Sequence, residues 1–525
     1  MSSPGAAAPA TATPAFAPPP MTGMPLAITA LMLALGTFMQ VLDSTIANVS
    51  LPTIAGNLGV SPDQGTWVIT SFAVSNGIGV PLTGWLMGRY GVVKIFVLSV
   101  LAFTIASFLC GIAWSLPSLI FFRILQGGVS GPMIPGSQAL LISIFAANKR
   151  ATALGIWSIT TLVAPICGPI LGGYISDNFH WGWIFLINVP VGLIVTFLCW
   201  RALKDRETPT RKLPIDMVGL GLLIVWVGSL QVMLDTGKDL DWFASTQVII
   251  LALVAVIFFV GFLIWELTEK YPIVDLSLFK NRNFALGTLA FCLGYAVFFA
   301  NGLLLPLWLQ TQVGYTATWA GLVAAPTGAI AVLLTPLTAR MMSRVDSRII
   351  ATLAFIAFAV SYFLRSGLTA DASFFNFVLP LLVQGIAMAT FFLAMITILL
   401  DGVPPQRIPS ASGVSNFVRI TAGGFAASVV TTVWDRREAL HQSRLADQTT
   451  IFSPYLRGAV ADLHRLGLPE LGAQASIART MVSQAYLLAS DDIFWASGWI
   501  CIVLIAMVWL CRKAKSGGGA PVAAD

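Results

Sequence analysis

The sequence predicts an all-α integral membrane protein with fourteen transmembrane helices. Of its 525 residues, 57% are hydrophobic and only 10% are charged, and the mean hydropathy is +0.84. A soluble globular protein has about 25% charged residues. Apolar runs of about 20 residues, the length that crosses a bilayer as a helix, recur along almost the whole chain. A soluble fold is excluded, because it would have no core large enough to bury this surface.

Polar segments, or segments that contain Gly and Pro, separate the apolar runs and mark the ends of the helices. Two examples are GNLGVSPDQG and DRETPTRKLP. In chain order, the fourteen predicted helices cover residues 25–51, 65–87, 93–113, 116–141, 151–175, 182–201, 214–234, 246–267, 283–310, 318–342, 348–366, 374–400, 408–434 and 491–511.

Lys and Arg predict the orientation of these helices. Nearly all basic residues of the short connections lie on one side, and the short connections of the other side hold only Lys238 and Arg365. Cytoplasmic loops carry this excess of positive charge, so residues 1–24 and 512–525 are expected to be cytoplasmic tails. The first tail is rich in Pro, Ala, Ser and Thr and is expected to be disordered. The net charge of +6 therefore reflects topology rather than nucleic-acid binding.

The long segment 435–490 is predicted on the outside although it carries six arginines. Long loops cross the membrane largely regardless of their charge, so these arginines do not contradict the orientation.

An internal repeat divides the predicted helices into groups of six, two and six. Three pairs of sites recur at a spacing of roughly 255–258 residues. Repeats of this kind place a binding site at the interface of the two halves. The pairs are PLTGWLMGR (81–89) with PLTARMMSR (336–344), Gln126-Gly127 with Gln384-Gly385, and Arg150 with Arg407. The predicted parts are an N-terminal bundle at 25–201, a linker with two additional helices at 202–282, and a C-terminal bundle at 283–511 that includes the loop 435–490.

Three ionisable residues lie well inside predicted helices: Asp43, Arg123 and Arg419. Such groups are costly in a bilayer, and their default interpretation is functional, although a structural ion pair is the alternative. Asp43 and Arg123 lie roughly 13 and 9 Å below the same outer surface at 1.5 Å rise per residue, so they can meet. We expect Asp43 to carry a proton and Arg123 to be its charge partner.

The second half lacks this pair. The repeat position of Arg123 is Leu381, and that of Asp43 is close to Asn301, which is polar but does not titrate. Proton coupling should therefore lie mainly in the first half.

Two further segments have an unusual glycine and proline content. APICGPILGG (164–173) weakens the backbone bonding of the fifth helix and permits close packing. GWLMGRYGVVK (84–94) is a tight turn with basic anchors between the second and third helices. The candidate gating residues in them are Gly84, Arg89, Gly91, Pro165, Gly168, Pro169, Gly172 and Gly173.

A membrane-embedded enzyme is disfavoured because the three histidines are scattered outside the predicted helices and no catalytic His motif is present. The six cysteines have no metal-binding spacing and are expected to be small apolar packing residues. An importer or uniporter of the same fold and a channel remain alternatives, which the lone Asp43 disfavours. No cofactor is expected beyond a proton gradient.

Four segments resemble motifs of the major facilitator superfamily, and specifically of its fourteen-helix drug:proton antiporters. They are LDSTIANVSLP (42–52), GWLMGRYGVVK, FFRILQGGVSG (121–131) and APICGPILGG. The match departs from the family at Gly88, where an Asp is usual. The resemblance implies the major facilitator fold and proton-driven export of hydrophobic or amphipathic drugs across a bacterial inner membrane.

The resemblance also implies partners. These would be a periplasmic membrane-fusion adaptor like EmrA and an outer-membrane channel like TolC. The segment 435–490, with Arg436, Arg437, His441 and Arg457, is expected to contact the adaptor or to form a solvated helical cap.

Drug contacts are expected from amides and aromatic rings on helices at the interface of the halves. The candidates are Gln40, Asn48, Gln138, Asn301, Gln384, Phe391, Phe392 and Asn416.

Overall fold

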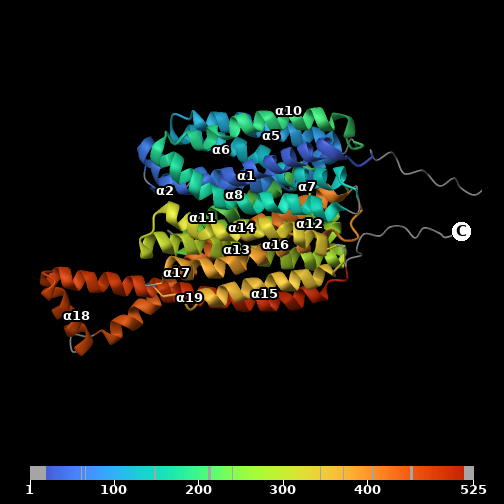
Figure 1. The fold of residues 1–525 in the computed structure, drawn as a ribbon. Coiled ribbons are helices and arrows are strands. Elements are labelled where there is room, and N and C mark those ends of the chain that lie inside the picture. Colours follow the sequence, from blue (N-terminus) through green and yellow to red (C-terminus); the bar gives the residue numbers. More distant parts are fainter. Residues whose placement is uncertain are drawn as a thin grey trace, which may run out of the picture.

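The computed structural model describes residues 19–513 except 61, 66, 147–148, 211–213, 239, 343, 370–371, 405–406 and 450–452. Within these ranges the secondary structure is helical, without a strand. Figure 1 shows the long helices lying side by side in one bundle, from which a helical hairpin projects at one end. We call this end the hairpin end.

Helices are present at all fourteen predicted positions. The first six predicted helices correspond to α1 (Gly23–Leu58), α3 (Trp67–Gly79) with α4 (Thr83–Tyr90), α5 (Val92–Gly111), α6 (Leu116–Ser130) with α7 (Met133–Ile144), α8 (Arg150–Asn178), and α9 (Trp183–Leu186) with α10 (Asn188–Leu203). The other eight correspond to α11 (Met217–Thr236), α12 (Thr246–Thr268), α13 (Arg282–Trp308), α14 (Ala317–Met341), α15 (Ser347–Arg365), α16 (Phe374–Leu400), α17 (Ile408–Gln448) and α19 (Glu470–Leu510). The short helices α2 (Pro62–Gly65) and α18 (Pro454–Arg465), three 3₁₀ turns and the π-helical turn Leu309–Val313 complete the described part.

Eleven helices in the described ranges are long and apolar enough to cross a membrane. Two of the other predicted helices are interrupted: α3 ends before α4 begins, and α6 is separated from α7 by Gly131-Pro132. The proline explains the second interruption, since it lacks an N–H and cannot continue the helix without losing a bond. The third predicted helix outside these eleven is α8, which is not interrupted; it is 29 residues long and contains the Gly/Pro run.

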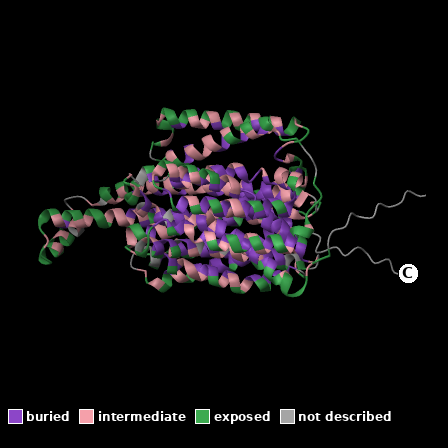
Figure 2. Cartoon of the chain, turned by 90° about the horizontal axis from the view of Figure 1, so that it is seen from above, coloured by how far each residue is buried: buried purple, intermediate pink, exposed green. Residues whose placement is uncertain are grey.

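The segment predicted as the long loop 435–490 is mostly helical. α17 continues to Gln448, α18 follows, and α19 begins at Glu470, so two transmembrane helices extend beyond the bundle as a hairpin. Asp492 at its base accepts hydrogen bonds from Arg437 at 2.8 Å and pairs with His441 at 2.7 Å. The burial colouring in Figure 2 shows buried residues inside the bundle and exposed or intermediate ones along the projecting hairpin.

Close helix packing recurs at equivalent places in the two halves of the chain. A Cβ on Gly127 of α6 would lie 2.4 Å from the carbonyl oxygen of Phe72 on α3. A Cβ on Gly385 of α16 would lie 2.8 Å from the carbonyl oxygen of Thr327 on α14. Gly385 lies 258 positions after Gly127, and Thr327 lies 255 positions after Phe72. The spacing of the sequence repeat therefore recurs in the packing.

The two halves of the chain also pack on each other. Gly155 of α8 faces Thr335 of α14, and Ile170 of α8 lies against Gly321 of α14. At the end opposite the hairpin, α4 contacts α17, where a Cβ on Gly84 would lie 2.6 Å from the hydroxyl of Ser410. Only glycine fits there without displacing α17, because the opposing contact includes the Ser410 backbone at 3.1 Å. The two halves therefore pack directly on each other at that end.

Candidate functional site

Asp43 lies on α1 in the interior of the N-terminal half, with none of its surface exposed. Its Oδ2 accepts a hydrogen bond of 2.6 Å from Nη1 of Arg123 on α6, whose side chain is 1% exposed. The predicted pair therefore meets within the first half. A carboxylate and a guanidinium at this distance offset each other's charge in a region that excludes water.

Two amides complete the coordination of the Asp43 carboxylate. Gln126 on α6 donates to Oδ1 at 3.0 Å, and Asn188 at the start of α10 donates to the same oxygen at 2.9 Å. Gln126 also donates to Ser107 of α5 at 2.7 Å and accepts from Arg123 at 2.8 Å. Four helices, α1, α5, α6 and α10, thus contribute to one hydrogen-bonded cluster, which we call the Asp43 cluster.

Arg123 is fixed by more than its ion pair. Its Nε donates to the carbonyl oxygen of Val68 on α3 at 3.0 Å. Its guanidinium lies 4.1 Å from the ring centroid of Phe72 and 5.4 Å from that of Phe185. These contacts require a planar, forked cation and stabilise its charge by cation–π attraction. Arg123 therefore connects α6 to α1 and α3 through separate donors.

The Gly/Pro run of α8 packs α8 against α1 next to this cluster. A Cβ on Gly168 would lie 2.2 Å from the Thr45 hydroxyl, and one on Gly172 would lie 2.9 Å from the carbonyl oxygen of Ile46. Both contacts fall within one turn of Asp43. Small residues permit this approach of two membrane helices. A shift of α8 would move the backbone that carries Asp43.

The turn 84–94 is held by a residue outside it. Gly91 has φ of +97°, and a Cβ there would lie 2.2 Å from the Glu207 carboxylate. Glu207 accepts the backbone N–H groups of Val93 at 3.0 Å and Lys94 at 2.9 Å, so it caps α5. Glycine is needed at 91 for both its backbone conformation and this space. At Gly88, where the related family usually has Asp, a Cβ would meet open space.

A second polar contact joins the two halves of the chain. Asn416 on α17 donates to Gln138 on α7 at 3.4 Å and accepts from Arg419 at 3.1 Å. The Arg419 guanidinium lies 4.4 Å from the ring centroid of Tyr295 on α13. Tyr295 in turn contacts Phe392 at 6.2 Å between centroids. The structure thus brings three of the predicted drug-binding residues and Arg419 into one connected group.

The comparisons with known proteins agree with this architecture. Residues 33–428 match the family model of the Major Facilitator Superfamily. The chain belongs to the major facilitator superfamily. It is therefore a membrane transporter of that superfamily and not an enzyme, and the resemblance predicted from its motifs is confirmed.

Two relatives within the superfamily show the similarity in detail. The chain is 49% identical over 505 residues to the multidrug export protein EmrB of Escherichia coli K12, covering 95% of this chain and 98% of EmrB. It is also 49% identical over 501 residues to the fatty acid resistance protein FarB of Neisseria gonorrhoeae, covering 95% and 99% of the two chains. Among solved structures, the human organic anion transporter MFSD10 matches with a TM-score of 0.57 at 13% identity, over 93% of this chain and 100% of that one.

Several residues predicted as drug contacts or gating residues lie apart from the Asp43 cluster. Phe391 and Phe392 are buried in an aromatic cluster on α16, with Phe391 5.5 Å from the ring of Phe291. Gln40 is 3% exposed, and its Oε1 has no hydrogen-bond partner among the described residues. Arg89 lies 5.4 Å from the Trp85 ring, and Gly173 is buried in α8. The side chains of Asn48, Pro165 and Pro169 lie outside the described residues.

Sequence reasoning missed three members of the Asp43 cluster, Ser107, Gln126 and Asn188, and two buried charges elsewhere. Gln126 was marked only by its repeat, and Asn188 begins an apolar segment as its single amide. Arg365, assigned to an outer loop, is 1% exposed, and Glu266 near the end of α12 is 3% exposed. Glu266 accepts the backbone N–H of Val274 at 3.2 Å. The sequence did not predict the burial of either residue, because both lie near helix ends, where burial depends on which way the side chain points.

Proposed function

We propose that the chain is a proton-driven multidrug efflux transporter of the bacterial inner membrane. The similarity over nearly the full length to EmrB, a multidrug export protein, supports drug export. The fatty acid resistance named for FarB fits amphipathic substrates. The observation that supports proton coupling is the buried Asp43 carboxylate with its Arg123 partner. Asp43 is the proton carrier in this proposal, and Arg123 is its charge partner.

The geometry suggests how exchange works. Asp43 accepts three hydrogen bonds and has no exposed surface, so a proton reaches it only when the helices around it move. The contact of α8 with α1 beside Asp43 couples such a movement to the interface with α14. Alternating access requires that this movement open Asp43 to one side at a time. A drug that favours one arrangement then favours the matching protonation state of Asp43.

The drug-binding region is proposed at the interface of the halves, around the connected group that includes Gln138, Asn416 and Arg419. Amides there can form hydrogen bonds with varied ligands, and Tyr295 and Phe392 supply aromatic surface. Gln138, Asn416, Phe392 and Arg419 are buried in this structure, as are the candidates outside this group, Gln40, Phe391, Asn301 and Gln384. A drug would therefore contact any of these side chains only after rearrangement.

The partners are proposed by analogy with the relatives and the projecting hairpin. The transporter would work with an EmrA-like periplasmic adaptor and a TolC-like outer-membrane channel, with both termini in the cytoplasm. The hairpin of α17, α18 and α19 would then face the periplasm and contact the adaptor.

The decisive experiment replaces Asp43. In everted membrane vesicles, Asp43→Asn should abolish drug accumulation driven by a pH gradient, because the amide cannot carry the proton. Downhill drug counterflow without a pH gradient should persist, since the fold and the drug site remain. Asp205→Asn, at an exposed position after α10, is the matched control and should behave like the unaltered protein. Normal gradient-driven accumulation by Asp43→Asn would refute the assignment.

A further inference from the structure

The C-terminal half contains a buried polar cluster at the repeat positions of the Asp43 cluster. Asn301, Arg365, Leu381 and Gln384 each lie 258 positions after Asp43, Ser107, Arg123 and Gln126, in that order. All four are at most 3% exposed, and they lie on α13, α15 and α16. We call these positions, with the adjoining Tyr362 and Ser497, the Arg365 cluster.

Two of its hydrogen bonds join the same pairs of repeat positions or helices as two bonds of the first half. Asn301 donates to Ser497 on α19 at 2.9 Å, in the way that Asp43 contacts Asn188 on α10. Arg365 donates to Gln384, as Ser107 contacts Gln126. These two bonds therefore connect corresponding helices in the two halves.

Their charges differ. In the first cluster, the Arg123 cation faces the Asp43 carboxylate. In the second, the carboxylate is replaced by the Asn301 amide, and the cation is moved to position 365. No ion pair within the described ranges includes Arg365, whose guanidinium is 1% exposed. A cation buried in a protein interior without a counter-charge costs several kcal/mol.

Two hydrogen-bond donors near the Arg365 guanidinium are unsatisfied within the described part of the chain. Nε of Arg365 and the hydroxyl of Tyr362 are both buried and have no hydrogen-bond partner among the residues that the structure describes. The two side chains are three residues apart on α15, and so lie on one face of it. The guanidinium also lies 5.4 Å from the Tyr362 ring centroid and 5.7 Å from that of Phe494. A water molecule could satisfy these donors, but it would not offset the charge.

We propose that the Arg365 cluster binds one compact monovalent anion, held by the Arg365 guanidinium and the Tyr362 hydroxyl. The anion takes the place of the carboxylate that the second half lacks. It is a halide or the carboxylate group of a small acid, because both accept hydrogen bonds and carry one negative charge. Arg365 is 1% exposed and its guanidinium lies near the rings of Tyr362 and Phe494, so we expect the site to admit only small anions. The site needs neither drug nor pH gradient, so it is independent of the role proposed for Asp43.

The test measures the thermal unfolding of the full-length protein purified in detergent, at constant ionic strength, in sodium gluconate, chloride, bromide or formate. A specific anion should raise the midpoint by about 2 °C or more over gluconate, which is too large to enter. Stabilisation by chloride and bromide identifies a halide site, and stabilisation by formate alone identifies a carboxylate site. Equal midpoints in all four salts would overturn the proposal.

Two variants locate the effect. Arg365→Gln should lose the response to anions and should be at least as stable as the unaltered protein in gluconate, because it removes an unpaired buried cation. Asn301→Asp should also lose the response, because it supplies an internal carboxylate at the repeat position of Asp43. Arg201→Gln, at an exposed end of α10, is the matched control and should keep the full response.

A full response in both variants would place the anion elsewhere and refute the site. If Arg365→Gln cannot be purified, Asn301→Asp and the anomalous signal of bromide in crystals of the unaltered protein decide the matter. A bromide peak beside Arg365 is expected, and bromide peaks only at other positions would overturn the proposal.

Discussion

At the scale of single residues, the main feature is a carboxylate that is satisfied on every side. The Asp43 carboxylate accepts from the Arg123 guanidinium and the Gln126 amide, both on α6, and from the Asn188 amide on α10. Removing one partner of a buried pair is more harmful than removing both, because the remaining charge stays buried without compensation. This asymmetry provides a test of the pair that does not depend on transport.

Arg123→Met should therefore destabilise the protein strongly, by about 3–5 kcal/mol, since Asp43 would be left unpaired. Combining it with Asp43→Asn should restore most of the stability, but no proton-driven transport. Thermal midpoints of the two single variants and the double variant measure this coupling. Additive effects of the two substitutions would show that the pair does not interact energetically.

At the scale of helices, carboxylates cap the N-termini, one from a distant part of the sequence and one from the residue directly before its helix. Glu207 caps α5 from beyond α10, and Asp346 caps α15 through the N–H of Arg348 at 3.0 Å. Arg348 also donates to the carbonyl oxygen of Cys511 at the end of α19. A carboxylate at a helix N-terminus satisfies free N–H groups and interacts favourably with the helix dipole.

Glu207→Ala should lower the thermal midpoint, because two backbone N–H groups of α5 lose their acceptor at a cost of about 0.5–2 kcal/mol. Glu207→Gln should lower it less, since one carbonyl oxygen remains. The exposed neighbour Asp205→Asn serves as control. If the alanine variant unfolds at the same temperature as the unaltered protein, the cap contributes nothing to stability.

Asp346 gives a pH-dependent prediction. Hydrogen bonds from the Arg348 side chain, one of them 2.8 Å long, hold the pKa of the Asp346 carboxyl below its usual value of 3.8, and the Arg348 charge adds to this effect. A lowered pKa stabilises the fold above the ordinary pKa, and this stabilisation is lost as the pH falls through the folded-state value. The midpoint difference between the unaltered protein and Asp346→Asn should be constant near neutral pH and shrink below about pH 4. A difference that is unchanged between pH 7 and 3 would contradict the ion pair.

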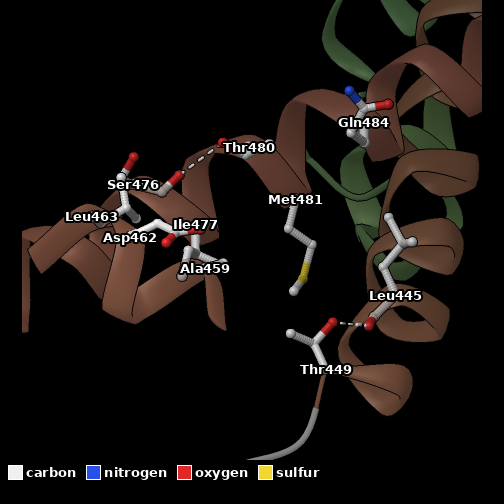
Figure 3. Close-up of a pocket in the computed structure, with 10 residues that line it drawn as sticks. All are labelled: Leu445, Thr449, Ala459, Asp462, Leu463, Ser476, Ile477, Thr480, Met481 and Gln484. Carbon is white, nitrogen blue, oxygen red and sulfur yellow. Dashed lines mark hydrogen bonds between the residues drawn. The ribbon is translucent and has the colours of Figure 1, made fainter. Parts of the chain in front are cut away.

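At the scale of the whole molecule, the hairpin is the part that departs from the bundle. A groove of about 530 Å³ lies between its helices, lined by residues of α17, α18 and α19 and by Thr449. Figure 3 shows the side chains that line it. Leu445, Leu463, Ile477 and Met481 supply apolar surface that is only half-buried. Of the residues predicted to contact the adaptor, Arg437 and His441 are bonded to Asp492 at the base, and the groove is a further candidate for that contact.

Leu445→Asp with Met481→Asp should abolish resistance in cells that contain the adaptor, because the charges prevent an apolar contact. Efflux in everted vesicles that lack the adaptor should be unchanged. Leu471→Asp, at a residue 83% exposed and outside the groove, is the control. Full resistance in the double variant would support the alternative that the hairpin is only a solvated cap.

The helices themselves could be predicted well because a membrane helix must satisfy its own backbone and bury an apolar run of fixed length. The predicted 408–434 and 491–511 were too short at the hairpin end, since polar helices outside a bilayer have no such signal. The meeting of Asp43 with Arg123 could also be predicted, because each was the rare charge in an apolar run and their depths matched. Gln126 and Asn188 could not be chosen among many amides on depth alone.

The amino-acid sequence determined the membrane class, the positions of the helices, the repeat and the Asp43–Arg123 pair, because hydropathy, charge and spacing report directly on the cost of burial. Only the tertiary structure decided which neutral side chains complete the Asp43 cluster, that Glu207 holds the turn at Gly91, and that Arg365 points inward. Those facts depend on the rotation of one helix against another. The stretch QVLDSTIANVSLP (40–52) places a single carboxylate in an apolar run, which makes Asp43 exceptional, but it does not show which three donors surround that carboxylate.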